Sequence, residues 1–181
     1  MFLAIILCVS LACTADKSNK KITIKNLYSI EVPSGMTKTS TINSDASLQY
    51  QNLIKDEYII VIDEPISEFY NALEGSEVSQ DLQGYYDIVV ANLEMAASEL
   101  HITDKEDIKI NSLPAKLFTA TARVENYDVF YKYCVVEGQK NFYQILYWTS
   151  SDKKNKRQEA MTATIKTFQE VAKKEKRKIN K

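Results

Sequence analysis

Hydrophobic and polar residues alternate along six segments of the chain, and a period of two is the pattern of a β-strand with one buried face. These segments are residues 21–25, 27–32, 47–53, 116–124, 129–136 and 141–149. Residues 57–63 are instead almost continuously aliphatic, which predicts a central strand that is covered on both faces. Residues 108–110 form a shorter candidate strand, and the last three alternating segments predict a meander of three strands.

Two segments carry apolar residues at spacings of three and four, the pattern of a helix with one buried face. The first spans residues 80–100 and follows a capping residue at Ser79. Its apolar stripe consists of Leu82, Tyr86, Val89, Leu93, Met95–Ala97 and Leu100. The second follows a cap at Ser150, Ser151 or Asp152, and its shared face consists of Met161, Ile165, Phe168 and Ala172. Pro65 ends the strand at 57–63, and residues 66–73 predict a short helix.

Strands, a helix, strands and a helix follow one another with hairpin-type connections. This order predicts an α+β fold in which an antiparallel β-sheet is flanked by helices. The chain has 181 residues, 45% hydrophobic and 26% charged, which suffices for one well-buried domain. We therefore expect a single domain at residues 22–172, followed by a basic tail at residues 173–181.

The first residues of the chain form an uncharged apolar run at positions 2–12. A membrane span needs about 20 apolar residues, so this run is too short to cross a bilayer. It has the length of the hydrophobic region of a signal peptide. Ala12 and Cys13 follow the run, and residues 14–21 are polar. The alternative interpretation is a short buried segment at the N-terminus.

This arrangement resembles a bacterial lipoprotein signal with its lipobox, Ser10-Leu11-Ala12-Cys13. The resemblance implies that residues 1–12 are removed as a signal peptide and that Cys13 is the lipidation site, carrying acyl chains such as palmitate. Residues 13–21 would then be a flexible tether. The protein would be lipid-anchored to a membrane on the periplasmic side of the cell envelope. Thr14, in place of aspartate, favours the outer membrane if the host is Gram-negative.

The order of four segments in the rest of the chain is similar to that of the PsbP-like family. These are Tyr28–Gly35, the strand Tyr58–Asp63, Leu113–Ala115 leading into the meander, and Ile165–Phe168 closing the last helix. The family includes the extrinsic photosystem II protein, the yeast Ran-release factor and bacterial lipoproteins such as DcrB. The resemblance implies an α/β/α sandwich without catalytic apparatus, in proteins that act mostly as binding or assembly factors.

Residues able to carry chemistry are few and scattered. If Cys13 is acylated and Cys8 removed, Cys134 is the remaining thiol, and its apolar strand predicts a buried, inert side chain. His101 is the only histidine, directly after the long helix, without a second ligand at metal-binding spacing. The carboxylates Asp63-Glu64 and Asp104 with Glu106-Asp107 lie at predicted strand ends and loops, where solvated charges are usual. We therefore predict no catalytic, cofactor-binding or metal-binding residues and no cofactor; an enzyme that uses tyrosines or carboxylates is the remaining alternative.

Two surfaces remain as candidates for binding. Aromatic residues gather in the meander: Tyr127, Phe130, Tyr131, Tyr133, Phe142, Tyr143, Tyr147 and Trp148. Alternation places them on both faces of the sheet, so most belong to the core, and an exposed remainder would bind a hydrophobic ligand or a partner. From Lys153 onward eleven basic residues accompany three acidic ones, which fits either contact with anionic lipid headgroups or a solvated helix end.

The sequence thus predicts a membrane-anchored cell-envelope lipoprotein that acts as a non-enzymatic binding or assembly module. Its partner would be an envelope protein or a hydrophobic ligand, and not a nucleic acid, because an exported protein rarely meets one. The alternative is a carrier of a hydrophobic small molecule or lipid, held in a gap between sheet and helix.

Overall fold

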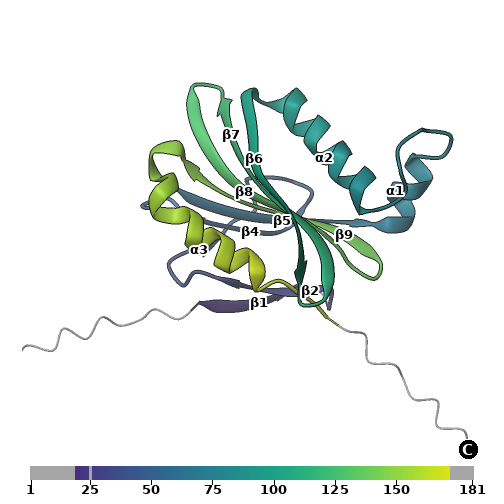
Figure 1. Ribbon diagram of the computed structural model, residues 1–181. Helices are drawn as coiled ribbons and strands as arrows, with labels where there is room; N and C mark the ends of the chain where they lie inside the picture. Colours follow the sequence, from purple (N-terminus) through teal and green to yellow (C-terminus); the bar gives the residue numbers. More distant parts are fainter. Residues whose placement is uncertain (1–18, 25, 172–181) are drawn as a thin grey trace, which may run out of the picture.

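The computed structural model describes residues 19–24 and 26–171 of the protein (Figure 1). Its strands are β1 (Lys20–Ile24), β2 (Tyr28–Val32), β3 (Thr37–Lys38), β4 (Ala46–Asn52), β5 (Glu57–Pro65), β6 (Ser98–Ile110), β7 (Leu113–Val124), β8 (Tyr127–Glu137), β9 (Asn141–Ser150) and β10 (Gln169–Glu170). Its helices are α1 (Ile66–Ala72), α2 (Leu82–Ala96) and α3 (Lys154–Lys166), the last preceded by the 3₁₀ turn η1 (Ser151–Lys153).

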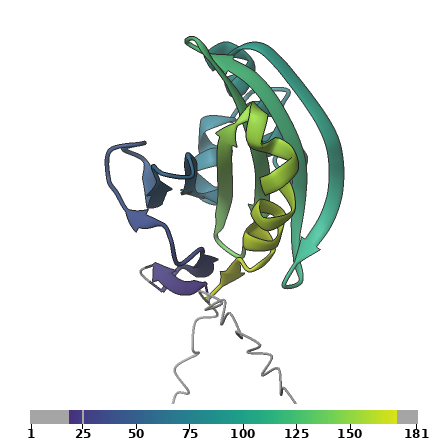
Figure 2. The same cartoon turned by 90° about the vertical axis from the view of Figure 1, so that its left-hand side faces the viewer.

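Seven strands form the main sheet in the order β3-β4-β5-β9-β8-β7-β6, and β1, β2 and β10 form a small sheet in the order β1-β2-β10. Every strand pair is antiparallel. Helices α1 and α2 lie on one face of the main sheet, while α3 and the small sheet lie on the other (Figures 1 and 2). The predicted α+β fold, an antiparallel sheet flanked by helices, is confirmed.

Aromatic side chains join the layers on both faces. Beneath α3, the buried ring of Tyr28 stacks on Phe168 with centroids 5.2 Å apart and meets the edge of Tyr143 at 5.5 Å. Beneath α1 and α2, Phe142 stacks on Tyr85 at 4.3 Å. Such ring pairs bury large apolar surfaces in defined orientations, so they fix how each helix sits on the sheet.

The helix predicted at residues 80–100 is shorter at both ends, and its last four residues, 97–100, were assigned wrongly. Asp81, rather than Ser79, is the N-cap residue, and its side chain accepts a hydrogen bond from the backbone N–H of Gly84 at 2.9 Å. The helix ends at Ala96 because the backbone becomes extended at Ala97. Residues 98–110 then form β6, so the meander has four strands instead of three, and His101 lies in a strand and not at a helix end.

Only residues 108–110 of β6 were predicted as a strand, and the rest escaped prediction because β6 is irregular and lies at the edge of the sheet. It pairs only with β7, and its register shifts between Ser98 and His101 and again between Thr103 and Glu106. Charged residues and bulges are usual on edge strands, where they oppose pairing with another chain. They also remove the alternation by which a strand is recognised. The carboxylates of Asp104, Glu106 and Asp107 therefore lie along a strand and not in a loop.

The last helix also ends earlier than its pattern suggests. Met161, Ile165 and Phe168 are fully buried as predicted, but α3 ends at Lys166. Phe168 follows the helix, and the next two residues form β10, which pairs with β2. The backbone carbonyl of Phe168 accepts a hydrogen bond from the side-chain amide of Asn111 at 2.6 Å. Ala172 lies outside the described residues.

The predicted signal peptide at residues 1–12, the lipidation site Cys13 and the basic tail at residues 173–181 also lie outside the described residues. Strand β1 begins at Lys20, so it includes the last two residues of the predicted tether at 13–21. None of the described helices is long and apolar enough to span a membrane.

Candidate functional site

Three aromatic side chains lie side by side on a part of the main sheet that the helices leave uncovered. Strand register places Tyr58 of β5 and Tyr131 of β8 on either side of Trp148 of β9. The Tyr58 and Trp148 rings are stacked, with centroids 5.3 Å apart and planes inclined by 14°, and Tyr131 lies 6.1 Å from Trp148. All three are half-buried. They belong to the α2 face, but the α2 side chains pack further along it, on residues such as Phe118 and Tyr133.

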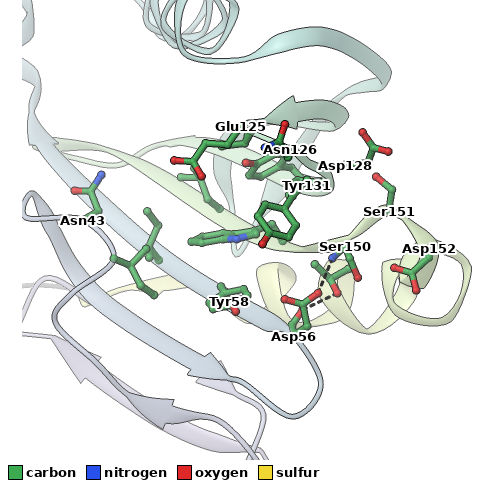
Figure 3. A pocket seen from close by; sticks show the side chains of 18 residues that line it. Asn43, Asp56, Tyr58, Glu125, Asn126, Asp128, Tyr131, Ser150, Ser151 and Asp152 are labelled. Atoms are coloured by element: carbon green, nitrogen blue, oxygen red, sulfur yellow. Dashed lines mark hydrogen bonds between the residues drawn. The ribbon is translucent and has the colours of Figure 1, made fainter.

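These rings form the floor of a cleft with a volume of about 1010 Å³ (Figure 3). Its walls are the loop at Ile42 and Asn43, the β7–β8 turn at Glu125 and Asn126, and the residues that follow β9. Among the described residues, none from α1, α2 or α3 lines it. The volume is at the upper end of the range of small-molecule sites, about 300–1,000 Å³. Another hollow, beside Leu117 and α3, has a volume of about 450 Å³.

The charged residues that line the cleft are all acidic: Asp56, Glu125, Asp128 and Asp152. Asp56 lies 3.3 Å from Nζ of Lys153 and accepts a hydrogen bond from the backbone N–H of Ser150. Burial opposes ionisation of Asp56, but these donors outweigh it and lower its pKa. Asp128 pairs with Arg123 at 2.9 Å, whereas Glu125 and Asp152 form no ion pair with a described residue. The rim of the cleft therefore carries uncompensated negative charge.

Tyr58 and Tyr131 remain protonated at neutral pH. Burial raises the pKa of Tyr131, and burial together with the nearby Asp56 carboxylate raises that of Tyr58. A tyrosine with a raised pKa is not ionised at neutral pH, and a neutral phenol is a poor base and a poor nucleophile. Both side chains therefore supply apolar ring surface and a neutral hydroxyl group, which are means of binding.

The structure does not bring the candidate residues from the sequence together. Cys134 is fully buried on the α3 face, where burial raises the pKa of its thiol. His101 is exposed on β6, and Asp63 and Glu64 lie in the last part of β5. Among the described residues, no three histidine, cysteine or carboxylate side chains are grouped so that they could hold a metal ion.

The aromatic meander divides between core and cleft. Five of its residues are buried in the two cores: Phe130, Tyr133, Phe142, Tyr143 and Tyr147. The other three, Tyr127, Tyr131 and Trp148, line the cleft. Sequence reasoning missed Tyr58 and the acidic rim. The signal for Tyr58 was its position in the 57–63 run, where it shares the face of Ile60 and opposes that of Ile59.

No protein-family model matches the sequence, and no curated protein matches it. Solved structures do resemble the fold. The cyanobacterial PsbP, CyanoP, from Synechocystis sp. PCC 6803 has a TM-score of 0.62 at 12% sequence identity, over 89% of this chain and 97% of that one. The chain has a PsbP-like fold.

Two further structures are similar at lower scores. A protein of unknown function from Pseudomonas aeruginosa has a TM-score of 0.51 at 13% identity, over 83% of this chain and 95% of that one. A protein from Bacteroides thetaiotaomicron has a TM-score of 0.53 at 9% identity, over 86% of this chain and 50% of that one. At these identities the similarity concerns the fold alone.

Proposed function

We propose that the protein is a non-enzymatic binding module of the cell envelope, held to a membrane through lipid on Cys13, and that the aromatic cleft is its binding site. One observation carries the binding role: Tyr58, Trp148 and Tyr131 present a continuous, half-exposed aromatic surface in a concave part of the sheet. Large aromatic surface that the fold leaves open is typical of interaction sites.

The chemistry of the described residues supports binding over catalysis. The thiol of Cys134 is buried, and Tyr58 and Tyr131 are held in their protonated state. An enzyme of acyl or phosphoryl transfer needs an activated nucleophile or a positioned base in its cleft. The side chains of this cleft instead offer apolar rings, amides and carboxylates. The resemblance to PsbP-like proteins, which act mostly as binding or assembly factors, points the same way.

The arrangement of the fold is compatible with a lipid anchor before β1. Both views place β1 at the opposite end of the molecule from the β7–β8 turn, which forms one wall of the cleft (Figures 1 and 2). A tether leading from β1 to the membrane would leave the cleft facing away from the bilayer. The chain leaves the described part at Val171, whose backbone N–H donates to the carbonyl of Leu27, directly before β2 in the small sheet, at 2.8 Å. A basic tail beginning there would lie near the same headgroups.

Fatty-acid labelling tests the anchor. Cells that express the wild-type chain, Cys13→Ala or Cys8→Ala are fed an alkyne analogue of palmitate, and label on the protein is measured. We expect label on wild type and Cys8→Ala and none on Cys13→Ala. Equal label on Cys13→Ala would refute the anchor.

Site-specific photo-crosslinking in the same cells tests the cleft. A benzophenone amino acid replaces Tyr127, which lines the cleft, or Lys109, which is exposed near the other end of the main sheet. We expect a discrete adduct from position 127 and none from position 109. Adducts of the same size and amount from both positions, or from neither, would contradict binding at the cleft.

The volume of the cleft also favours a second candidate, a carrier of a hydrophobic small molecule. Buried side chains such as Tyr85, Val89 and Phe142 fill the space between α2 and the sheet, so such a ligand would occupy the cleft. Mass spectrometry of organic extracts from the purified protein would find a stoichiometric lipid in the wild type and less of it in Trp148→Ala. Extracts without such a lipid would exclude the carrier.

A further inference from the structure

We infer that the cleft and the turns around it form a docking face for a protein partner, and that the occupant is an extended segment carrying basic residues beside apolar ones. This inference rests on the proposed function in that it uses the same cleft. It adds the class of ligand and extends the site beyond the cleft itself.

The first observation concerns exposed apolar side chains. Among the described residues, the four large hydrophobic side chains that are exposed are Leu53 (69%), Ile54 (97%), Met95 (79%) and Tyr127 (72%). Single exposed hydrophobics are common, and a gathering of them marks an interaction surface. Whether these four side chains mark an interaction surface therefore depends on where they lie in the fold.

All four lie at one end of the main sheet. Leu53 and Ile54 form the turn between β4 and β5, which leads to Glu57 opposite Thr149 at the end of β9. Tyr127 opens β8, two residues before Val129, which pairs with Ser150. Met95 precedes β6, whose first residue pairs with Arg123 at the end of β7. The cleft lies at this same end, between the β4–β5 turn and the β7–β8 turn.

The size of this face fits a peptide segment. Strands β5, β9, β8, β7 and β6 are neighbours in the sheet, so the face extends over four strand spacings, or roughly 20 Å. An extended segment of about six residues has that length. A small molecule would fill the cleft but leave Leu53, Ile54 and Met95 exposed, so a protein segment accounts for more of the surface.

Charge indicates the character of the segment. The cleft is lined by four carboxylates and by no lysine or arginine, and Glu125 and Asp152 lack a counter-charge among the described residues. A lysine or arginine of the segment that lies against the rings of Trp148 or Tyr58 gains a cation–π attraction. This adds to its attraction to the carboxylates. An anionic bilayer or a nucleic acid would be repelled. Electrostatic and apolar complementarity together select a basic, apolar segment.

Trp148 is the single tryptophan of the chain and lies in the cleft, so its fluorescence reports binding there directly. The full chain is titrated with the acetylated peptide Lys-Phe-Lys-Leu-Lys-Phe and with counterparts in which glutamine or glutamate replaces every lysine. We expect a saturable change in Trp148 fluorescence with the lysine peptide. The glutamine peptide should bind at least tenfold more weakly, and the glutamate peptide should not bind. Raising the salt concentration should weaken the binding of the lysine peptide.

Variants separate the two parts of the face. Glu125→Gln/Asp152→Asn should lower the affinity for the lysine peptide severalfold. Leu53→Ser/Ile54→Ser, which leaves the aromatic floor of the cleft intact, should do the same. The matched control Glu74→Gln/Glu159→Gln removes two exposed carboxylates from α3 and from the segment after α1 and should bind like wild type. Circular dichroism checks that each variant is folded.

Equal affinity for the lysine and glutamine peptides would overturn the inference, and so would the absence of binding by the lysine peptide. Wild-type affinity in both Glu125→Gln/Asp152→Asn and Leu53→Ser/Ile54→Ser would also overturn it. None of these results alters the palmitate labelling of Cys13 or an adduct from position 127. Failure of the ligand class and failure of the proposed function are therefore distinguishable.

Discussion

Trp148 stacks on Tyr58 across the β5–β9 pair, with ring centroids 5.3 Å apart and planes inclined by 14°. The two residues are 90 positions apart in the chain and face one another because β5 and β9 pair in register. Both rings are half-buried and line the cleft. This pair therefore links the order of the strands to the surface proposed for binding.

The acidic rim of the cleft should favour the approach of cations over anions to Trp148. Caesium and iodide both quench tryptophan fluorescence and have opposite charges, and negative potential concentrates cations. Each Stern–Volmer constant is divided by that of free N-acetyltryptophanamide with the same ion, because iodide is intrinsically the stronger quencher. We expect the normalised constant to be about twofold larger for caesium than for iodide at low ionic strength. The difference should shrink in Glu125→Gln/Asp152→Asn and in denaturant. Equal normalised constants of the native wild type for both ions would be inconsistent with an uncompensated rim.

A buried ion pair between β5 and α3 should contribute strongly to stability. Oε1 of Glu57 lies 3.1 Å from Nε of Arg157, and the Glu57 side chain is only 5% exposed. Arg157→Gln leaves this carboxylate buried without its counter-charge and should lower the free energy of unfolding by about 3 kcal/mol.

Urea denaturation measures that loss, and two variants control it. Adding Glu57→Gln to Arg157→Gln should restore part of the stability, since the unpaired charge is gone. Arg123→Gln breaks the exposed pair with Asp128 and should cost less than about 1 kcal/mol. Similar losses in Arg157→Gln and Arg123→Gln would show that burial of Glu57 has no energetic effect.

Cys134 should be unreactive in the folded protein. The thiol is fully buried and burial raises its pKa, so both access and thiolate formation are suppressed. In a Cys8→Ser/Cys13→Ser background, we expect no reaction with Ellman's reagent at pH 8 without denaturant and one thiol per chain in 6 M guanidinium. Cys134→Ala in that background should give no signal under either condition. Rapid modification of the native thiol would place it at the surface.

The N-cap of α2 should make stability depend on pH. Asp81 accepts a hydrogen bond from the backbone N–H of Gly84, and this bond, with that from the Ser79 hydroxyl, lowers its pKa. Because the folded-state pKa is below the unfolded value, the charged cap stabilises the fold above the unfolded pKa. That contribution is lost as pH falls through the folded-state pKa.

Comparison of two variants isolates this effect. Asp81→Ala should lower the free energy of unfolding by about 1 kcal/mol at pH 7. Asp81→Asn keeps a capping side chain and should lose less free energy of unfolding. Its difference from wild type should shrink as the pH falls from 7 to 3, because the wild-type carboxylate becomes protonated. A difference between wild type and Asp81→Asn that is the same at pH 7 and pH 3 would exclude the carboxylate charge as the cause.

The strands that the sequence predicted well are those with a regular buried face. In β8 and β9 successive side chains point to opposite faces of the sheet, as Phe130 and Tyr131 do in β8 and Tyr147 and Trp148 do in β9. Only residues 108–110 of β6 were predicted. The rest of the strand was missed because, within the described part of the chain, β6 is paired on one side only and is interrupted by two register shifts, so its polar sequence follows no period. The shortened helices have a similar cause: Leu100 and Phe168 continue an apolar spacing that the backbone itself does not follow.

By itself the sequence determined the fold class, the positions of most strands and the presence of aromatics on both faces of the meander, because alternation and spacing report burial residue by residue. The tertiary structure alone decided which aromatic side chains remain accessible in the cleft. Tyr58, Tyr131 and Trp148 meet through strand register, and they remain accessible because α2 packs on a different part of the sheet. Register and helix placement are relations between distant segments, and no local pattern of residues contains them.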